Sequence, residues 1–154
     1  MRHASPSVLC LDLGTNLGWA LLSENRIISG SFKTTLHTKE AVGVRFLRFE
    51  NEFLRQFRSV REVHFEDVCR HEGTHAAHVF GGFWAILNKW CVQNTIPLYA
   101  VGVGVWKKEI IGKGNATKEQ VLACMKKRGF NPIDYNEADS LAILHYVCDR
   151  ARKQ

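Results

Sequence analysis

Two patterns of apolar residues alternate along the chain, and each predicts a different kind of element. Short apolar runs and alternations rich in β-branched residues favour strands, whereas apolar residues three and four apart favour amphipathic helices. Strands are expected at residues 8–13, 18–23, 26–32, 62–68 and 97–104. Helices are expected at residues 40–58, 74–93, 114–129 and 136–153.

The order of these elements predicts an α/β fold. The first three strands follow one another through short turns at residues 14–17 and 23–25, which favours an antiparallel meander. Helix, strand, helix, strand and two helices come after them, a layout typical of a mixed sheet with helices packed on it. We therefore expect a five-stranded mixed sheet flanked by helices, in a single domain over residues 1–154.

Three acidic residues interrupt segments whose pattern otherwise indicates burial. Asp12 lies near the end of the first strand, Glu66 in the middle of the fourth, and Asp139 in the first turn of the last helix. An ionised carboxylate that is buried without a partner costs several kcal/mol, so each needs compensation. Taken singly, Asp12 could accept hydrogen bonds from the turn that follows it, and Asp139 could interact with the helix dipole.

Taken together, the three acids favour a metal site. Neighbouring strands and a helix packed on them could bring all three carboxylates to one edge of the sheet. Like charges at such closeness repel unless a cation lies between them, and carboxylates are usual ligands of Mg²⁺. A cluster of this kind is suited to two-metal cleavage of a phosphodiester.

Composition adds a basic charge to this picture. The formal net charge is +6 and the sequence pI about 9.2, while the hydrophobic and charged fractions, 45% and 23%, are ordinary for a globular protein. A basic balance favours a polyanionic partner such as a nucleic acid. Charge alone fits equally well a basic protein without such a partner.

The cysteines and the apolar segments favour a protein of the cytoplasm. Five cysteines are scattered without a C-x-x-C pair, which is typical of reduced thiols rather than of a disulfide framework. No stretch approaches the roughly 20 apolar residues that a membrane span needs. The first residues lack the apolar core of a secretory signal.

Four segments, in this order, resemble the RuvC-type Holliday junction resolvases of the RNase H-like nuclease superfamily. They are "LDLGTNLGWA", "HFEDV", "WKKEIIGKGNATKEQV" and "NEADSLAIL". The first alone is a weak signal, because sugar kinases and actin-like ATPases open similarly, whereas the late combination is much more specific. The resemblance covers residues 7–150 and is strongest to versions carried by bacteriophages, which implies the cytoplasm of a bacterial host.

The resemblance implies that Asp12, Glu66 and Asp139 are catalytic metal ligands for two Mg²⁺ or Mn²⁺ ions. Many members carry a fourth acid three residues before the last, and Asn136 stands there in this chain. An amide can ligate through its carbonyl oxygen but adds no charge, so we expect weaker binding of the second metal. Glu137 is adjacent but would point elsewhere on a helix.

Basic residues are expected to stabilise the phosphate and bind the DNA backbone. The resemblance places Lys118, and with less weight Lys108, near the phosphate, where a cation offsets growing negative charge. Lys118 is favoured because Thr117, with Gln120 at the capping-box position, puts it in the first turn of a helix, where a cation is otherwise unfavourable. The predicted DNA-binding residues are Lys107, Lys108, Lys113, Lys118, Arg70 and His71. Lys126, Lys127 and Arg128 fit a solvated helix end better.

The segment 69–78, "CRHEGTHAAH", departs from the family. In well-known relatives this loop carries an aromatic residue that wedges into the junction centre, whereas Cys69 and Arg70 occupy the region here. Its histidines lack the spacing of a zinc site, so contact with phosphate or a plain surface role is the expectation. In the helix that follows, Phe80, Phe83, Trp84, Leu87 and Trp90 resemble core plus a dimer face, and the resemblance implies a homodimer.

We therefore expect an endodeoxyribonuclease that resolves branched, four-way DNA by paired symmetric nicks, leaving a 5′-phosphate and a 3′-hydroxyl. A related RNA-processing nuclease is an alternative, which the basic segment "GKGNATKEQ" disfavours. A junction-binding module that has lost cleavage is another, which only Asn136 favours. An actin-like ATPase is disfavoured because the chain is short for two lobes and shows no second phosphate loop.

Overall fold

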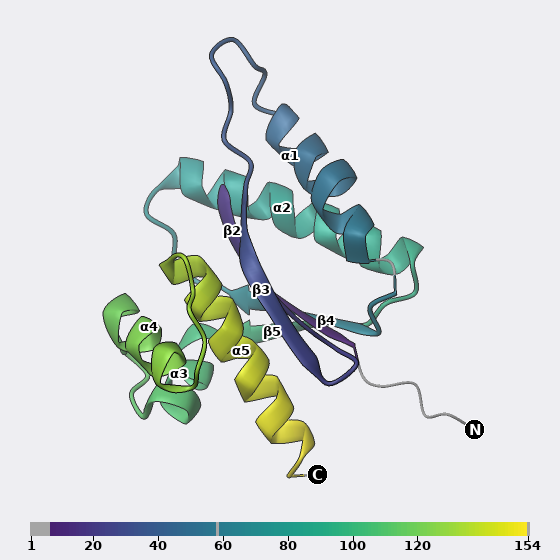
Figure 1. Cartoon of the computed structure of the whole chain (residues 1–154). Helices are drawn as coiled ribbons and strands as arrows, with labels where there is room; N and C mark the ends of the chain where they lie inside the picture. The colour runs from purple at the N-terminus through teal and green to yellow at the C-terminus, as the bar shows by residue number, and fades with distance from the viewer. Residues whose placement is uncertain (1–6, 58, 154) are drawn as a thin grey trace, which may run out of the picture.

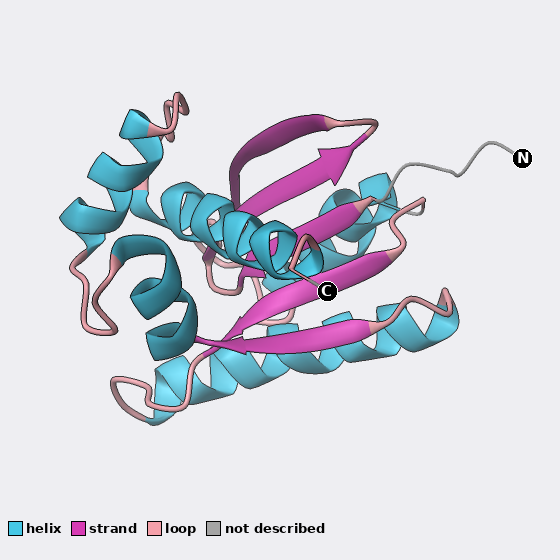
Figure 2. Ribbon diagram, turned by 90° about the horizontal axis from the view of Figure 1, so that it is seen from below, coloured by secondary structure: helices cyan, strands magenta, loops and turns pink. Residues whose placement is uncertain are grey.

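In a computed structural model that describes residues 7–57 and 59–153, five strands form one mixed sheet (Figure 2). The strands are β1 (Val8–Asp12), β2 (Asn16–Ser23), β3 (Arg26–Lys33), β4 (Glu62–Asp67) and β5 (Leu98–Gly102), in the order β3-β2-β1-β4-β5. β1, β2 and β3 pair antiparallel, while β4 lies parallel to both β1 and β5. The expected five-stranded sheet with an antiparallel meander is confirmed.

Helices cover both faces of this sheet (Figure 1). One face carries α1 (Val44–Arg48), which continues through η1 (Phe49–Phe53) and η2 (Leu54–Phe57), together with α2 (Thr74–Gln93). The other face carries α3 (Val103–Ile111), α4 (Lys118–Lys127) and α5 (Tyr135–Ala151). None of these helices combines the length and the apolar character that crossing a membrane requires.

One helix and several element ends differ from the sequence-based expectation. The expected strand 97–104 ends at Gly102, and α3 begins at once with Val103. The alternation of valine and glycine there imitates a strand, but Trp106 and Ile110 are buried at helical spacing and Gly112, with a φ of 93°, ends the helix. The helix expected over 40–58 begins only at Val44, and its last residue, 58, lies outside the described residues.

Strand alternation divides the core between the two faces. Leu9, Leu11 and Leu13 contact the cluster under α2, whereas Val8 and Cys10 contact the cluster under α5. Asp12 continues the second series and therefore faces the α5 side of the sheet. All five cysteines are free thiols, as expected.

A glycine lets α5 approach the sheet at this point. Gly18 lies opposite Asp12 in the β1–β2 register, and a Cβ there would lie 1.9 Å from the carbonyl oxygen of Asn136. Asp134, the N-cap of α5, accepts hydrogen bonds from Asn16 at 3.0 Å and from Ser31 at 2.6 Å. The position of α5 along the sheet is thus set by one close backbone contact and by these hydrogen bonds.

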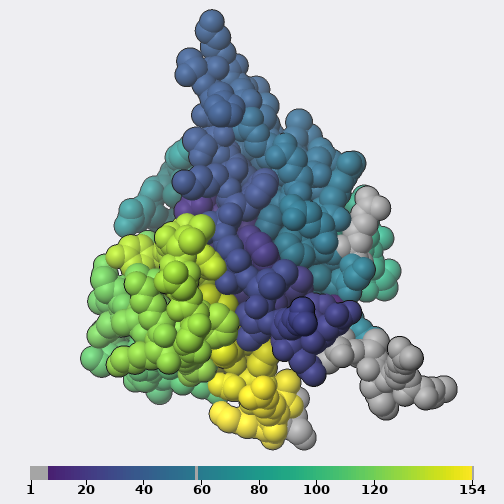
Figure 3. All heavy atoms as spheres, viewed as in Figure 1, coloured from purple at the N-terminus to yellow at the C-terminus, as the bar shows by residue number. Residues whose placement is uncertain are grey.

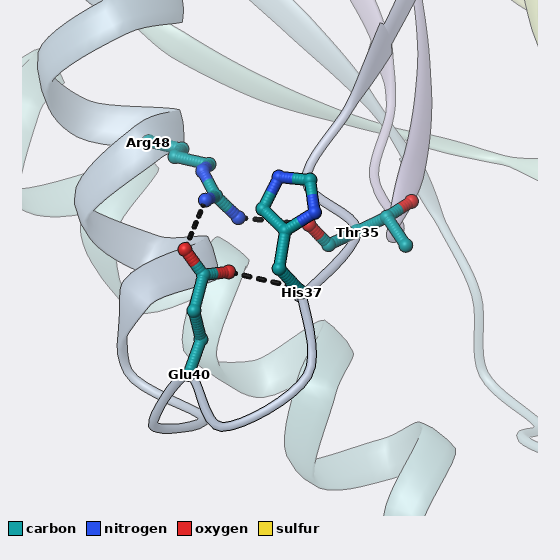
Figure 4. Close-up of polar contacts among 4 residues, drawn as sticks. All are labelled: Thr35, His37, Glu40 and Arg48. Carbon is teal, nitrogen blue, oxygen red and sulfur yellow. Dashed lines mark hydrogen bonds and ion pairs between the residues drawn. The ribbon is translucent and has the colours of Figure 1, made fainter.

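The loop between β3 and α1, residues 34–43, projects beyond this end of the sheet (Figures 1 and 3). At its base the backbone N–H of buried Thr34 donates to the carbonyl oxygen of Thr15, at 2.8 Å. Within the loop, Arg48 of α1 donates to the carbonyl oxygen of Thr35 at 2.8 Å and to Glu40 at 2.6 Å (Figure 4). The backbone N–H of His37 donates to the other oxygen of Glu40, so the loop is held to the turn after Asp12 and to α1.

The close contact at Gly18 predicts a large effect of one methyl group. Gly18→Ala should lower the free energy of unfolding by about 1–3 kcal/mol or more, because the backbone of α5 must move away from the sheet. Gly43→Ala is a matched control, since nothing lies within 4 Å of a Cβ there and its φ is −64°. Urea unfolding measures both, and equal midpoints for the two variants would contradict this account of α5.

Candidate active site

Asp12 and Glu66 lie side by side where β1 and β4 end. In the parallel register Leu11 is opposite Phe65, so the next residue of each strand is an acid. Glu66 is 7% exposed, and Asp139, which α5 brings to the same side of the sheet, is also 7% exposed. The three carboxyl groups are close enough to shift one another's pKa values. The structure therefore brings together the three acids that the sequence singled out.

The electrostatics of this cluster oppose its full ionisation. Burial, and then repulsion by Glu66 and Asp139, raise the pKa of Asp12 well above its usual value. Burial and repulsion by Glu66 raise the pKa of Asp139 to about 7. A hydrogen bond between Asp12 and Glu66 raises the pKa of Asp12 and lowers that of Glu66.

Trp106 positions Glu66, a contact that the sequence analysis missed together with α3. Its indole Nε1–H donates to Glu66 Oε1 at 3.1 Å, and the ring is fully buried. Burial raises the pKa of Glu66, and this hydrogen bond opposes the rise. A buried tryptophan needs an acceptor for its N–H, so its helical spacing from Ile110 is the signal that could have revealed the contact.

One oxygen of Asp139 has no protein partner. Asp139 Oδ1 is buried and accepts no hydrogen bond from any residue that the structure describes. A buried acceptor without a partner costs about 1–3 kcal/mol, and more when it is charged. A hard divalent cation satisfies such an oxygen and relieves the repulsion among the three acids, so the residues present fit Mg²⁺ or Mn²⁺.

The acids do not yet converge as metal ligands. Within residues 7–57 and 59–153, no three Asp, Glu, His or Cys side chains meet closely enough to hold an ion. This holds for the carboxylates and also for Cys69, His71, His75 and His78.

Two lysines lie near the carboxylates. The charge of Lys118 lowers the pKa values of Asp12, Glu66 and Asp139, and the capping box of Thr117 and Gln120 that was expected before it is formed. Lys107 lowers the pKa values of Glu66 and Asp139, and its ammonium lies 5.5 Å from the centre of the Trp106 ring.

Lys108, Lys113 and Arg70 are exposed side chains away from this charge coupling. His71 is half-buried, and its ring lies 4.8 Å from that of Phe80. Of the two neighbouring lysines, the structure thus brings Lys107 rather than Lys108 to the carboxylates. No contact in the structure tests the DNA-binding role of any of these residues.

The start of α5 differs from the expectation around Asn136. The helix begins at Tyr135, so Asp139 lies in its second turn, beyond the reach of a first-turn dipole contact. Asn136 is half-buried with its backbone against Gly18. The acid whose charge reaches Asp139 from this region is Asp134, which the sequence analysis missed although an aspartate before a helical run is a typical N-cap.

Asp134 and Glu137 have structural partners. Burial tends to raise the pKa of Asp134. Hydrogen bonds from Ser31 and the backbone N–H of Glu137 outweigh this effect and hold the pKa below its usual value. Glu137 is buried and accepts from the Ser29 hydroxyl at 2.6 Å and from the N–H of Ile133 at 2.8 Å. These bonds fix the helix start and occupy both side chains.

Along α2 the expected core residues Phe83, Leu87 and Trp90 are buried, and Phe80 packs beside them. Trp84 is 46% exposed, on the outer face of the helix. The exposed tryptophan is compatible with the dimer face that the sequence analysis expected there.

Solved structures share this fold. The chain is similar to T. thermophilus RuvC in complex with Holliday junction substrate, with a TM-score of 0.73 and 23% identity over 90% of each chain. It is also similar to a second structure of Thermus thermophilus RuvC, with a TM-score of 0.68 and 20% identity over 94% of this chain and 96% of that one. No protein-family model and no curated protein sequence matches. The chain therefore has the RNase H-like fold of RuvC, as expected.

The raised pKa values predict that the metal-free protein loses stability as the pH rises. An aspartate titrates near 3.9 in an unfolded chain, roughly, and Asp139 titrates at about 7 in the fold. The folded state thus holds an extra proton, and the stability that it confers is complete below about pH 4 and is lost as the pH rises to about 7. In EDTA, the urea concentration at the midpoint of unfolding should be lower at about pH 8 than at about pH 5.

Two comparisons attribute this pH dependence to the carboxylates. Asp139→Asn removes the titrating group and should flatten the dependence. Mg²⁺ at about pH 8 should raise the midpoint of the wild type but not that of Asp12→Asn, because an ion that binds only the folded state stabilises it. A wild-type midpoint that is constant with pH and indifferent to Mg²⁺ would contradict the proposed crowding.

The hydrogen bond from Trp106 predicts a specific defect in Glu66. Trp106→Phe keeps an aromatic ring but removes the N–H donor, so the pKa of Glu66 should rise further and stability should fall by about 1–3 kcal/mol. NMR titration of the glutamate carboxyl carbons measures the first effect and urea unfolding the second. Trp84→Phe, at an exposed position, should change neither. An unchanged titration of Glu66 in Trp106→Phe would exclude the positioning role.

Proposed function

We propose that this protein is a metal-dependent, structure-specific endodeoxyribonuclease that cuts branched, four-way DNA. The observation that carries the proposal is the crowding of Asp12, Glu66 and Asp139 at one end of the sheet, in a chain with the fold of RuvC. A protein rarely retains three crowded acids that destabilise one another unless the site serves a function. The T. thermophilus RuvC structure with a TM-score of 0.73 was solved in complex with a Holliday junction substrate.

The three acids would bind the metal ions, and Trp106 would position one of these acids. Asp12, Glu66 and Asp139 would together hold two divalent cations. When bound, two such ions activate a water molecule and stabilise the attacking and leaving oxygens of an in-line displacement. Trp106 orients Glu66 for this role through its indole N–H.

Lys118 and Lys107 would stabilise the charge that develops on the phosphate. Both ammonium groups already act on the carboxylates, so a phosphate bound there would lie within reach of two cations. Lys108, Lys113 and Arg70 would add contacts along the DNA backbone, which position a duplex without reading its sequence. His71 would contact the DNA beside them. The net charge of +6 favours such binding at low salt.

Symmetric resolution of a four-way junction needs two active sites, and we propose a homodimer for this reason. The exposed Trp84 on α2 is the residue that we expect at its interface. The products would be paired nicks with a 5′-phosphate and a 3′-hydroxyl. The sequence resemblance to bacteriophage members favours action in the cytoplasm of a bacterial host.

A junction-binding protein with weak or no cleavage is the second candidate. Asn136 supports it, because an amide in place of an acid removes one negative charge from the ligand set. The three retained acids favour the nuclease.

Cleavage of a synthetic four-way DNA junction at low salt separates the two candidates. The wild type should make paired symmetric nicks with Mg²⁺ or Mn²⁺ and none with EDTA. Asp12→Asn and Asp139→Asn should bind the junction without cutting it, and Lys118→Ala should cut about 10²- to 10³-fold more slowly. Lys126→Ala, at the exposed end of α4, and Glu52→Gln, an exposed acid with the same charge change, should behave as the wild type.

The outcomes distinguish the candidates clearly. A wild type that binds the junction but never cuts it with either metal would support the binding protein and assign the loss to Asn136. Restored cleavage in Asn136→Asp would then confirm that assignment. Equal cutting by wild type and Asp12→Asn would overturn the metal site itself.

A further inference from the structure

A groove begins at the turn that follows Asp12, on the face of the sheet opposite Asp139. It has a volume of about 510 Å³ and lies between this turn, α1 and the first half of α2. Its lining residues are Leu13, Gly14, Thr15, Arg45, Val68, His71, His75, Ala76, Val79 and Phe80. Because Leu13 and Asp12 point to opposite faces of β1, the groove and the carboxylates lie on two sides of one strand end.

The lining combines an apolar floor with basic groups. Leu13 and Val79 are buried, and the Phe80 ring packs against the ring of His71 at 4.8 Å. Arg45 and His75 complete the lining with hydrogen-bond donors, and no acidic side chain takes part in it. A phosphate needs donors but no apolar floor, whereas a nucleobase uses both a flat apolar wall and donors at its edge.

The side chain of Arg45 also lines the groove. Its Nε is buried and has no hydrogen-bond partner in the part of the chain that the structure describes. Arg48, about one turn further along α1, is occupied by Thr35 and Glu40 instead (Figure 4). An arginine fork matches the paired acceptors on the edge of a base, above all those of guanine.

Close packing of α1 against α2 forms one side of the groove. A Cβ at Gly82 of α2 would lie 2.4 Å from the Phe46 ring of α1, so this glycine lets the two helices approach. Phe46 also packs edge-on against Phe83, at 5.2 Å between ring centres. Arg45, the neighbour of Phe46, is thereby fixed at the groove, and on the other side Thr34 anchors the turn at Thr15.

We propose that this groove binds one unpaired, unstacked nucleobase at the branch point of the DNA whose strand lies in the active site. Phe80 and His71 would form the apolar wall, and Arg45 would donate to the base edge. An intact duplex offers no free base, whereas a branch point does so at low cost, so the groove would select branched DNA. The proposal rests on the proposed binding of branched DNA.

A fluorescent base tests the proposal without cleavage. A four-way junction that carries 2-aminopurine at the branch point is titrated with protein in EDTA, and unstacking raises its fluorescence. The wild type should produce this rise, whereas Arg45→Gln and Arg45→Lys should lose it and bind the junction roughly 5- to 100-fold more weakly. Arg55→Gln is the charge-matched control, because Arg55 lines a separate pocket with Gln93 at the far end of α2.

The lysine variant separates a base from a phosphate. A phosphate contact tolerates lysine as a point charge, but a fork-shaped contact with a base edge does not. Wild-type fluorescence and affinity in Arg45→Lys would therefore overturn the proposal in favour of a backbone contact. An equal loss in Arg55→Gln would overturn it in favour of general charge.

A second measurement uses the unaltered protein, so it does not depend on how the variants fold. A 5-iodouracil at the branch point, activated by light, should crosslink to a peptide from residues 69–83 that contains His71 or Phe80. A crosslink only to α3 or α4 would overturn the proposal. If the fluorescence rises but neither Mg²⁺ nor Mn²⁺ supports cutting, the nuclease fails and the groove stands; if the junction is cut without the rise, the groove alone fails.

Discussion

The whole site depends on how closely the first turn of α5 approaches β2. At Gly18 the backbone of Asn136 occupies the space that any Cβ would need, so this contact tolerates no side chain. Hydrogen bonds from Asn16 and Ser31 to the N-cap Asp134 then fix the helix along the sheet. Asp139 follows one turn later and reaches Asp12, the partner of Gly18 across β1 and β2. One missing methyl group therefore determines where the third carboxylate lies.

The carboxylates that this contact brings together destabilise the folded protein. Burial raises the pKa of all three, repulsion adds to the rise for Asp12 and Asp139, and one oxygen of Asp139 has no hydrogen-bond partner among the described residues. Lys118 and Lys107 reduce the repulsion but do not remove it, since Asp139 still titrates at about 7. Such strain is typical of sites whose missing partner is a cation, because the ion recovers the energy that the fold has lost.

Neighbouring residues at the end of β1 face opposite sides of the sheet. Strand alternation sends Asp12 toward α5, and Leu13 toward α2 and the basic groove. The turn at residues 14–15 lies between these two regions and is tied to the base of the projecting loop through Thr34. A DNA strand held at the carboxylates would thus pass close to a surface that offers apolar walls and an unused arginine donor.

Local sequence patterns were enough to predict the sheet, most of the helices and the three acids. Periodicity is a local property, so the strands, the amphipathic helices and the capping box of Thr117 and Gln120 follow from residues near one another in the chain. The acids stood out because each interrupts an apolar pattern. The helix from Val103 to Ile111 was missed because alternating valine and glycine imitates a strand, and with it the contact from Trp106 to Glu66.

Which charged groups meet depends on the folded chain and could not be predicted from these patterns. Lys107 rather than Lys108 reaches the carboxylates, and Asp134 rather than Asn136 is the charged neighbour of Asp139. Among the described residues, the Nε of Arg45 has no hydrogen-bond partner, whereas Arg48 is bonded to Glu40. Each of these choices distinguishes residues that stand close together in the sequence and have similar chemistry. Coulomb interactions and hydrogen bonds depend on distances across the fold, which local patterns do not contain.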